Sequence, residues 1–144
     1  MNVFAAVPSH RQLGIGLLVL RLALGVVFIV HGGQKLFQLG FAGTTGMMSQ
    51  MGVPAAGLVG PLLAIVEPLA GLALILGFLT RLAGLAIAID MICAIVLVHL
   101  PNGFFVPMGI EFVMMNAAAG LALAFLGAGP FSIDYNLQQR RLAR

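Results

Sequence analysis

Seven ionisable side chains lie inside long apolar runs or at their ends, where they could bind a polar ligand or transfer protons. They are Arg21, His31, Lys35, Glu67, Asp90, His99 and Glu111. A charged group in hydrocarbon is costly unless it is paired or hydrated, so such residues usually face the interior of a helix bundle and often have a function. We therefore treat these seven residues as candidates for a polar site.

The first apolar run places its polar residues on one face. Arg21, Leu24, Phe28, His31 and Lys35 are separated by steps of three or four residues, which is the repeat of one side of an α-helix. Arg21 and Lys35 then lie about 21 Å apart along the helix axis. We expect this face to point away from lipid.

Two acidic residues fall deep in the next two runs. Glu67 is expected between the levels of His31 and Arg21 and could be the counter-ion of either, and Pro68 beside it frees a backbone carbonyl. Asp90 is expected near the level of Arg21, which predicts an Arg21–Asp90 ion pair. That pair could be purely structural, because an ion pair inside a bundle can fix helix register without binding anything.

A polar cluster is expected at the outer end of the bundle. Its members are His31, Lys35, Glu67, His99 and Glu111. His99 could instead be an interfacial anchor or cap, and Glu111 could simply complement the dipole of the helix that it opens. The balance of charges predicts that one carboxyl, first of all that of Glu67, is protonated, or that a histidine is charged.

The composition is that of a membrane protein. The 144 residues are 61% hydrophobic and only 8% charged, with a mean hydropathy of +1.13, whereas a soluble domain has about a quarter charged residues. The net charge of +3 does not indicate nucleic-acid binding, because the basic residues form no patch. The single cysteine, Cys93, excludes an intramolecular disulfide or thiolate cluster. Neither His31 nor His99 has a metal-ligand spacing, and we expect Cys93 and Asn116 to be packing residues.

Four apolar runs predict an all-α integral membrane protein, a bundle of four transmembrane helices. The predicted helices cover about 13–37, 56–79, 82–100 and 109–126, with a short interfacial segment at 40–54. This arrangement divides the chain into an N-terminal segment (1–12), a membrane domain (13–135) and a basic tail (136–144). Small residues four apart, such as Gly84/Ala88 and Gly120/Ala124, predict close helix contacts.

The distribution of basic residues predicts the orientation of the chain. One side carries Arg11, Arg81, Arg140, Arg141 and Arg144, and the other carries only Lys35. The positive-inside rule then places both termini in the cytoplasm of a bacterial plasma (inner) membrane.

An ordered series of motifs runs through all four helices. It consists of Arg21-Leu-Ala-Leu-Gly25, Phe28, His31-Gly32 and Lys35, then Gly52-Val-Pro54, Glu67, Gly71, Gly77 and Thr80-Arg81, then His99, Gly109-Ile-Glu111 and Gly127-Ala-Gly129-Pro-Phe-Ser132-Ile-Asp134. With this series the chain resembles the DoxX family of small bacterial membrane proteins over about residues 13–135. The resemblance implies a four-helix membrane bundle, related to the membrane subunits of thiosulfate:quinone oxidoreductase and to partners in bacterial thiol and oxidative-stress redox systems.

The family pattern also bears on individual residues. Asp90 stands where an apolar residue is expected, so its pairing with Arg21 would be peculiar to this chain. Ser132 and Asp134 are expected to cap or tether a helix end, with Arg81 as the partner of Asp134.

Two classes of function remain open. In the first, the outer cluster lines a pocket for a quinone, because a quinone carbonyl needs a donor such as His or Lys and quinol oxidation needs proton acceptors such as Glu. Electrons would then come from a partner redox enzyme. In the second, the chain is a non-catalytic scaffold, a lipid or small-molecule binder, or a proton-coupled carrier, and it acts as a homodimer if it transports.

Overall fold

The structure, a computed structural model, describes residues 7–144. In this part of the chain the regular structure is entirely helical. The α-helices are α1 (His10–Gly33), α2 (Gly40–Gln50), α3 (Ala56–Leu76), α4 (Thr80–Ala94), α5 (Glu111–Leu126) and α6 (Ile133–Leu142). Two π-helical segments, η1 (Gln34–Leu39) and η2 (Ile95–His99), extend α1 and α4, and a short turn of 3₁₀-helix, η3 (Leu100–Asn102), follows η2.

Three helical stretches are long and apolar enough to cross a membrane. They are His10–Gln50, Ala56–Leu76 and Thr80–Asn102. The fourth apolar helix, α5, has 16 residues and is therefore about 24 Å long, less than the hydrocarbon thickness of about 30 Å. The predicted all-α membrane bundle is confirmed, with a fourth helix shorter than a typical span.

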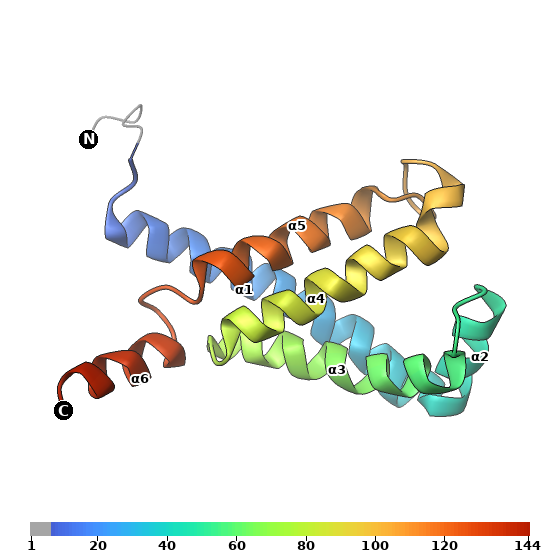
Figure 1. Ribbon diagram of the computed structural model, residues 1–144, viewed down its shortest axis with the longest axis horizontal. Helices are drawn as coiled ribbons and strands as arrows, with labels where there is room; N and C mark the ends of the chain where they lie inside the picture. The colour runs from blue at the N-terminus through green and yellow to red at the C-terminus, as the bar shows by residue number, and fades with distance from the viewer. Residues whose placement is uncertain (1–6) are drawn as a thin grey trace.

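The bundle consists of two helix pairs, α1 with α3 and α4 with α5 (Figure 1). Glycines allow both close contacts. A Cβ on Gly71 would lie 2.6 Å from the carbonyl oxygen of Gly25, and one on Gly84 would lie 2.7 Å from that of Gly120. The second contact confirms the prediction from small-residue spacing, because larger side chains would push α4 and α5 apart.

The hydrophobic core lies toward the end of the bundle at which α6 is found. Its buried members are Leu17, Leu24, Phe28, Ala70, Leu74, Ala83, Ile87 and Leu123, contributed by both helix pairs. Many large apolar side chains on the outside, among them Val30, Leu69 and Phe125, are exposed. An exposed apolar surface of this extent fits contact with lipid rather than water.

Helical structure extends beyond both ends of the predicted membrane domain, 13–135. Helix α1 begins at His10, because Ser9 and Gln12 form a capping box there, whereas residues 1–6 lie outside the described part. The predicted basic tail, 136–144, is largely helical, because α6 begins after Ser132, whose hydroxyl accepts from the Tyr135 N–H.

Candidate functional site

A cavity of about 700 Å³ lies between the two helix pairs, at the end of the bundle where α2 is found. Most of its lining is apolar and comes from α1, α3, α4 and α5. Helix α2 and the residues that follow it contribute Met47, Met48 and Met51, flexible side chains that adapt to irregular shapes. The predicted interfacial segment is therefore a helix that forms one wall of the cavity.

Six polar residues line this cavity. They are His31, Lys35, Glu67, Asp90, His99 and Asn116. Four of them belong to the predicted outer cluster, and Asp90 and Asn116 come from the facing helices α4 and α5. Within residues 7–144, no group of three or more His, Cys, Asp or Glu side chains could hold a metal ion.

Lys35 and Glu67 form a buried ion pair inside the cavity. The Lys35 Nζ lies 2.7 Å from the Glu67 Oε2, and the two side chains are only 14% and 4% exposed. Gly32 allows this approach, because a Cβ at that position would lie 2.9 Å from the Glu67 Cβ. The counter-ion of Glu67 is thus Lys35, and the expectation of His31 or Arg21 in that role was wrong.

Asp90 lies on the facing helix α4 and lines the same cavity as the ion pair. Two neighbouring negative charges in a buried site are unfavourable. The cavity wall therefore carries a second carboxyl besides the Lys35–Glu67 ion pair.

Two of the lining residues have a buried polar atom that lacks a hydrogen-bond partner within the described chain. They are the Oδ2 of Asp90 and the Nδ2 of Asn116. Asn116 is only 8% exposed, so it is buried as expected, but its amide is not satisfied by packing. Buried polar groups are usually hydrogen-bonded in folded proteins; in residues 7–144 the Oγ1 of Thr80, at the other end of the bundle, is the third such atom without a partner.

The two π-helical segments border the cavity and carry two of its polar residues. Lys35 lies in η1 and His99 in η2. A π-helical turn adds a residue to the helical repeat, and such turns are frequent at functional sites. The His99 ring is held by its Nδ1, which lies 2.7 Å from the Met108 carbonyl oxygen.

Aromatic rings line the part of the cavity near His31. The centroids of the His31 and Phe112 rings are 6.0 Å apart, with the ring planes tilted by 33°, and Phe28 also lines the cavity. Cys93 belongs to the lining as well and is exposed.

Arg21 lies apart from the cavity and bonds only to backbone carbonyl oxygens. Its guanidinium donates to Leu74 (2.9 Å), Ile75 (3.3 Å), Ala128 (2.6 Å) and Phe131 (3.0 Å), and the side chain is 1% exposed. The predicted Arg21–Asp90 ion pair does not form. Instead, the positive charge of Arg21 meets carbonyl oxygens at the C-terminal end of α3, where the helix dipole is negative, and in the loop after α5.

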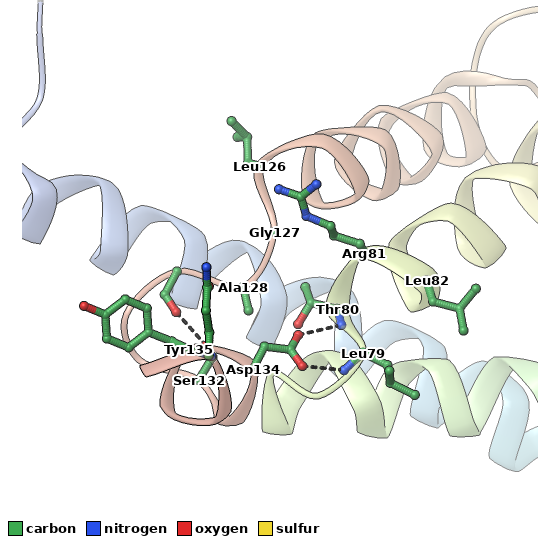
Figure 2. Close-up of a pocket in the computed structure, with 12 residues that line it drawn as sticks. Leu79, Thr80, Arg81, Leu82, Leu126, Gly127, Ala128, Ser132, Asp134 and Tyr135 are labelled. Atoms are coloured by element: carbon green, nitrogen blue, oxygen red, sulfur yellow. Dashed lines mark hydrogen bonds between the residues drawn. The ribbon is translucent and has the colours of Figure 1, made fainter. Parts of the chain in front are cut away.

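Asp134 makes the complementary contact at the same end of the bundle. Its carboxylate accepts hydrogen bonds from the backbone N–H groups of Leu79 and Thr80, both at 2.9 Å, and so caps the start of α4 (Figure 2). Arg81 points toward Leu126 and Gly127 instead. The predicted cap at Asp134 is confirmed, and Arg81 as its partner was wrong.

We call Arg21, Asp134 and the backbone groups that they bind the clasp. The clasp joins α1, α3, α4 and the segment from α5 to α6. It borders a smaller cavity of about 500 Å³, whose lining includes Thr80, Arg81 and Tyr135. Every bond of the clasp is made with backbone, so its residues act on the geometry of the bundle.

Glu111 also lies outside the large cavity. Its Oε1 accepts from the Val106 N–H at 3.0 Å, and the residue stands in the first turn of α5. This position matches the alternative in which Glu111 complements the helix dipole. The seven candidate residues thus divide into five at the cavity, one in the clasp and one at a helix start.

The two π-helical segments could not be recognised, because neither has a sequence signal. The backbone carbonyls of the clasp could not be recognised either, because they come from positions without polar side chains. Asn116 did carry a signal, since an amide in the middle of an apolar helix requires a partner. Asp90 was recognised as a candidate residue, but Arg21 was wrongly predicted to be its ion-pair partner.

Comparison with known proteins agrees with this architecture. The DoxX family model matches residues 16–100. The membrane protein Rv3486 of Mycobacterium tuberculosis is 37% identical, covering 96% of this chain and 94% of its own length. The putative oxidoreductase CatD of Bacillus subtilis is 31% identical over 85% of this chain and 90% of its own. The inner membrane protein YqjF of Escherichia coli is 35% identical over 88% and 95%, respectively.

No solved structure matches the chain. The family match spans more than half of the residues, and the relatives align over nearly their whole length. The apolar helices and the inner-membrane relatives together indicate a multi-pass protein of a bacterial membrane. This chain is a member of the DoxX family.

Proposed function

We propose that this chain is a membrane subunit of a bacterial redox system and that its large cavity binds a quinone or a similarly small redox molecule. The observation that carries the proposal is a cavity of about 700 Å³ whose mostly apolar walls hold the Lys35–Glu67 ion pair and the carboxyl of Asp90. Cavities of about 300–1,000 Å³ with apolar walls and a few polar groups are typical of small-molecule sites. A lipid-soluble ring with polar oxygens has the matching chemistry.

The polar groups suit both redox forms of such a ligand. The Lys35 ammonium and the His31 ring are donors for a carbonyl oxygen, and the Glu67 and Asp90 carboxyls are acceptors for hydroxyl protons. The name of the relative CatD, a putative oxidoreductase, supports a redox role. The chain has only one cysteine and hence no dithiol of its own, so we expect electrons to arrive from a partner redox enzyme.

We propose that one of the two carboxyls that line the cavity, Glu67 and Asp90, carries a proton. Lys35, 2.7 Å from Glu67, stabilises the ionised form of that carboxylate, so we place the proton on Asp90 rather than on Glu67 as the sequence suggested. The three side chains are then neutral together, as burial in a membrane favours. Infrared spectra should show a protonated carboxyl band that disappears in Asp90→Asn. A wild-type spectrum without this band contradicts the assignment.

Quinone binding can be measured with an introduced fluorophore, because the chain contains no tryptophan. Phe112→Trp places a reporter on the cavity wall. Phe125→Trp, on the same helix at a position 77% exposed, is the matched control for quinone dissolved in the detergent micelle. We expect ubiquinone-1 to quench the Phe112→Trp fluorescence saturably and the Phe125→Trp fluorescence only in proportion to its concentration.

The same experiment separates the two classes of function. Equal, unsaturable quenching of both reporters overturns the quinone proposal. If phospholipid then copurifies with the protein and is lost in Glu67→Gln, the alternative of a non-catalytic lipid binder is favoured. Native electrophoresis with chemical cross-linking of membranes tests the two proposed assemblies, a complex with a partner redox enzyme and a homodimer.

We further propose that both termini lie in the cytoplasm. The start of α1 and the whole of α6 lie at the same end of the molecule (Figure 1). That end carries Arg11, Arg81, Arg140, Arg141 and Arg144, as the positive-inside rule requires of a cytoplasmic side. A C-terminal green fluorescent protein fusion should fluoresce and an alkaline phosphatase fusion should be inactive. The opposite pair of results contradicts this orientation.

A further inference from the structure

The large cavity is bounded at both of its ends by packed side chains. Toward α6 it reaches the hydrophobic core, to which the lining residue Phe28 belongs. At the opposite end, Thr44 of α2 is fully buried, and its hydroxyl lies 3.0 Å from the Lys35 carbonyl oxygen. A Cβ on Gly60 of α3 would lie only 2.9 Å from the Thr45 nitrogen of α2. These contacts make α2 a fixed wall and leave the sides of the bundle, between the two helix pairs, as the routes into the cavity.

The two sides of the bundle differ in how the helix pairs meet. Between α1 and α5, the His31 and Phe112 rings have centroids 6.0 Å apart and bridge the gap. Helices α3 and α4 share a tight turn at 77–79 and spread apart from it toward the end where α2 is found (Figure 1). Within residues 7–144, no pair of aromatic rings joins α3 to α4. The gap between α3 and α4 is therefore the side that no such bridge closes.

Side chains that line the cavity at this gap are also open to the outside of the bundle. Leu62 of α3 and Ile89 of α4 are lining residues and are 53% and 54% exposed. Cys93, four residues after Ile89, and Leu97, four residues further on, are likewise exposed lining residues. The cavity alone does not give this exposure, because Val113 lines it and is only 5% exposed. We call Leu62, Ile89, Cys93 and Leu97 the portal residues, since they mark an opening.

This opening lies at the depth of the hydrocarbon layer. Leu62 and Cys93 are nearly equally far along the chain from Phe78, the middle of the turn between α3 and α4, so they lie at about the same level of the antiparallel pair. Cys93 comes about 20 Å after Thr80 along the helix axis, within a hydrocarbon layer of about 30 Å. The portal residues carry no charge, so at this depth they can contact acyl chains at no electrostatic cost.

On the basis of the proposed function, we propose that the quinone enters and leaves the cavity sideways, from the hydrocarbon of the bilayer, through a lateral portal between α3 and α4 that the portal residues border. The same cavity holds the Lys35–Glu67 ion pair, so an uncharged ring that enters here reaches polar partners without passing through water. The route selects the ligand by its solubility in lipid. A charged redox mediator is excluded, because a charge at this depth is costly.

The test measures how fast ubiquinone-1 enters and leaves the full chain in detergent, with the Phe112→Trp reporter. Stopped-flow mixing with ubiquinone-1 gives the rate constant of entry from the quenching. Mixing of the loaded protein with excess quinone-free micelles gives the rate constant of release from the recovery of fluorescence. A residue at an entrance changes the barrier that entry and release share, whereas a residue that contacts the bound ligand changes the affinity. The portal is therefore recognised by equal changes in both rate constants at a constant Kd.

Two substitutions narrow the portal from its two sides. Cys93→Phe adds a ring from α4 and Leu62→Phe adds one from α3, and each should lower both rate constants about tenfold while Kd stays within about twofold. The matched controls are Ile92→Phe and Ile65→Phe, on the same two helices at positions that are each 44% exposed and outside the lining. They add the same ring to the surface that faces the micelle and should change neither rate constant.

The outcomes distinguish this inference from the proposed function. Unchanged rate constants in both portal variants, with binding intact, overturn the portal while the proposed function stands. Slowing by Met51→Phe, directly after α2, without slowing by either portal variant places the entrance beside α2 and also overturns it. Faster release with weaker binding in Cys93→Phe and Leu62→Phe overturns it as well, because these residues would then belong to the binding surface. Absence of saturable quenching in the reporter chain overturns the proposed function, and the portal with it.

Discussion

The two ends of the bundle give their buried charges different partners. At the clasp, the Arg21 guanidinium donates to four carbonyl oxygens and the Asp134 carboxylate accepts from two N–H groups. At the cavity, the Lys35 ammonium and the Glu67 carboxylate bond to each other. Charges bonded to backbone hold helices in place, whereas a pair of side chains can exchange partners with a ligand. Charge depth alone does not separate these two arrangements; the type of partner does.

The largest loss of stability is expected from Arg21→Met. The substitution leaves several buried carbonyl oxygens without a donor, each worth about 1–3 kcal/mol, so the free energy of unfolding should fall by at least about 3 kcal/mol. This fall in the free energy of unfolding is measured by circular dichroism while the protein in detergent micelles is titrated with sodium dodecyl sulfate. Arg11→Met, at an exposed position in the first turn of α1, is the control. A loss as small as that of the control would mean that the clasp is not structural.

A smaller loss is expected from Asp134→Ala. It removes the cap of α4, and such caps contribute about 1–2 kcal/mol. The same unfolding titration measures the loss, and quinone affinity should stay within about twofold because the cavity is remote. Arg81→Met is the matched control and should cost little, since Arg81 points away from Asp134 (Figure 2). Equal losses in the two variants would restore the ion pair predicted from the sequence.

The smallest effect on stability, with a large effect on binding, is expected from the double variant Lys35→Met/Glu67→Gln. Removing both members of a buried ion pair is often neutral or stabilising, whereas removing one leaves an unpaired charge that costs about 3–5 kcal/mol. The double variant should therefore unfold within about 1 kcal/mol of the wild type and lose saturable quenching of the Phe112→Trp reporter. Retained quenching would show that the ion pair has no part in binding.

Much of the architecture could be predicted from the sequence, because hydrophobic run length and small-residue spacing report on local helix geometry. The Gly84 and Gly120 contact is an example. Ion-pair partners could not be predicted. Residue depth was estimated from helix rise, which ignores the π-helical turn that carries Lys35. The sequence also does not show that Arg21 bonds to backbone carbonyl oxygens rather than to a carboxylate. Helix α6 was also missed, since its polar residues resemble a solvated tail while its start depends on the single cap at Ser132.

The most direct test of ligand binding in the cavity is photolabelling of the purified protein with an azido derivative of ubiquinone, followed by mapping of the labelled peptides. Labels are expected in peptides that contain Glu67 and Asp90, from both helix pairs, and excess ubiquinone-1 should remove them. Labels spread over outward side chains such as Phe125, with no effect of the competitor, would contradict the account.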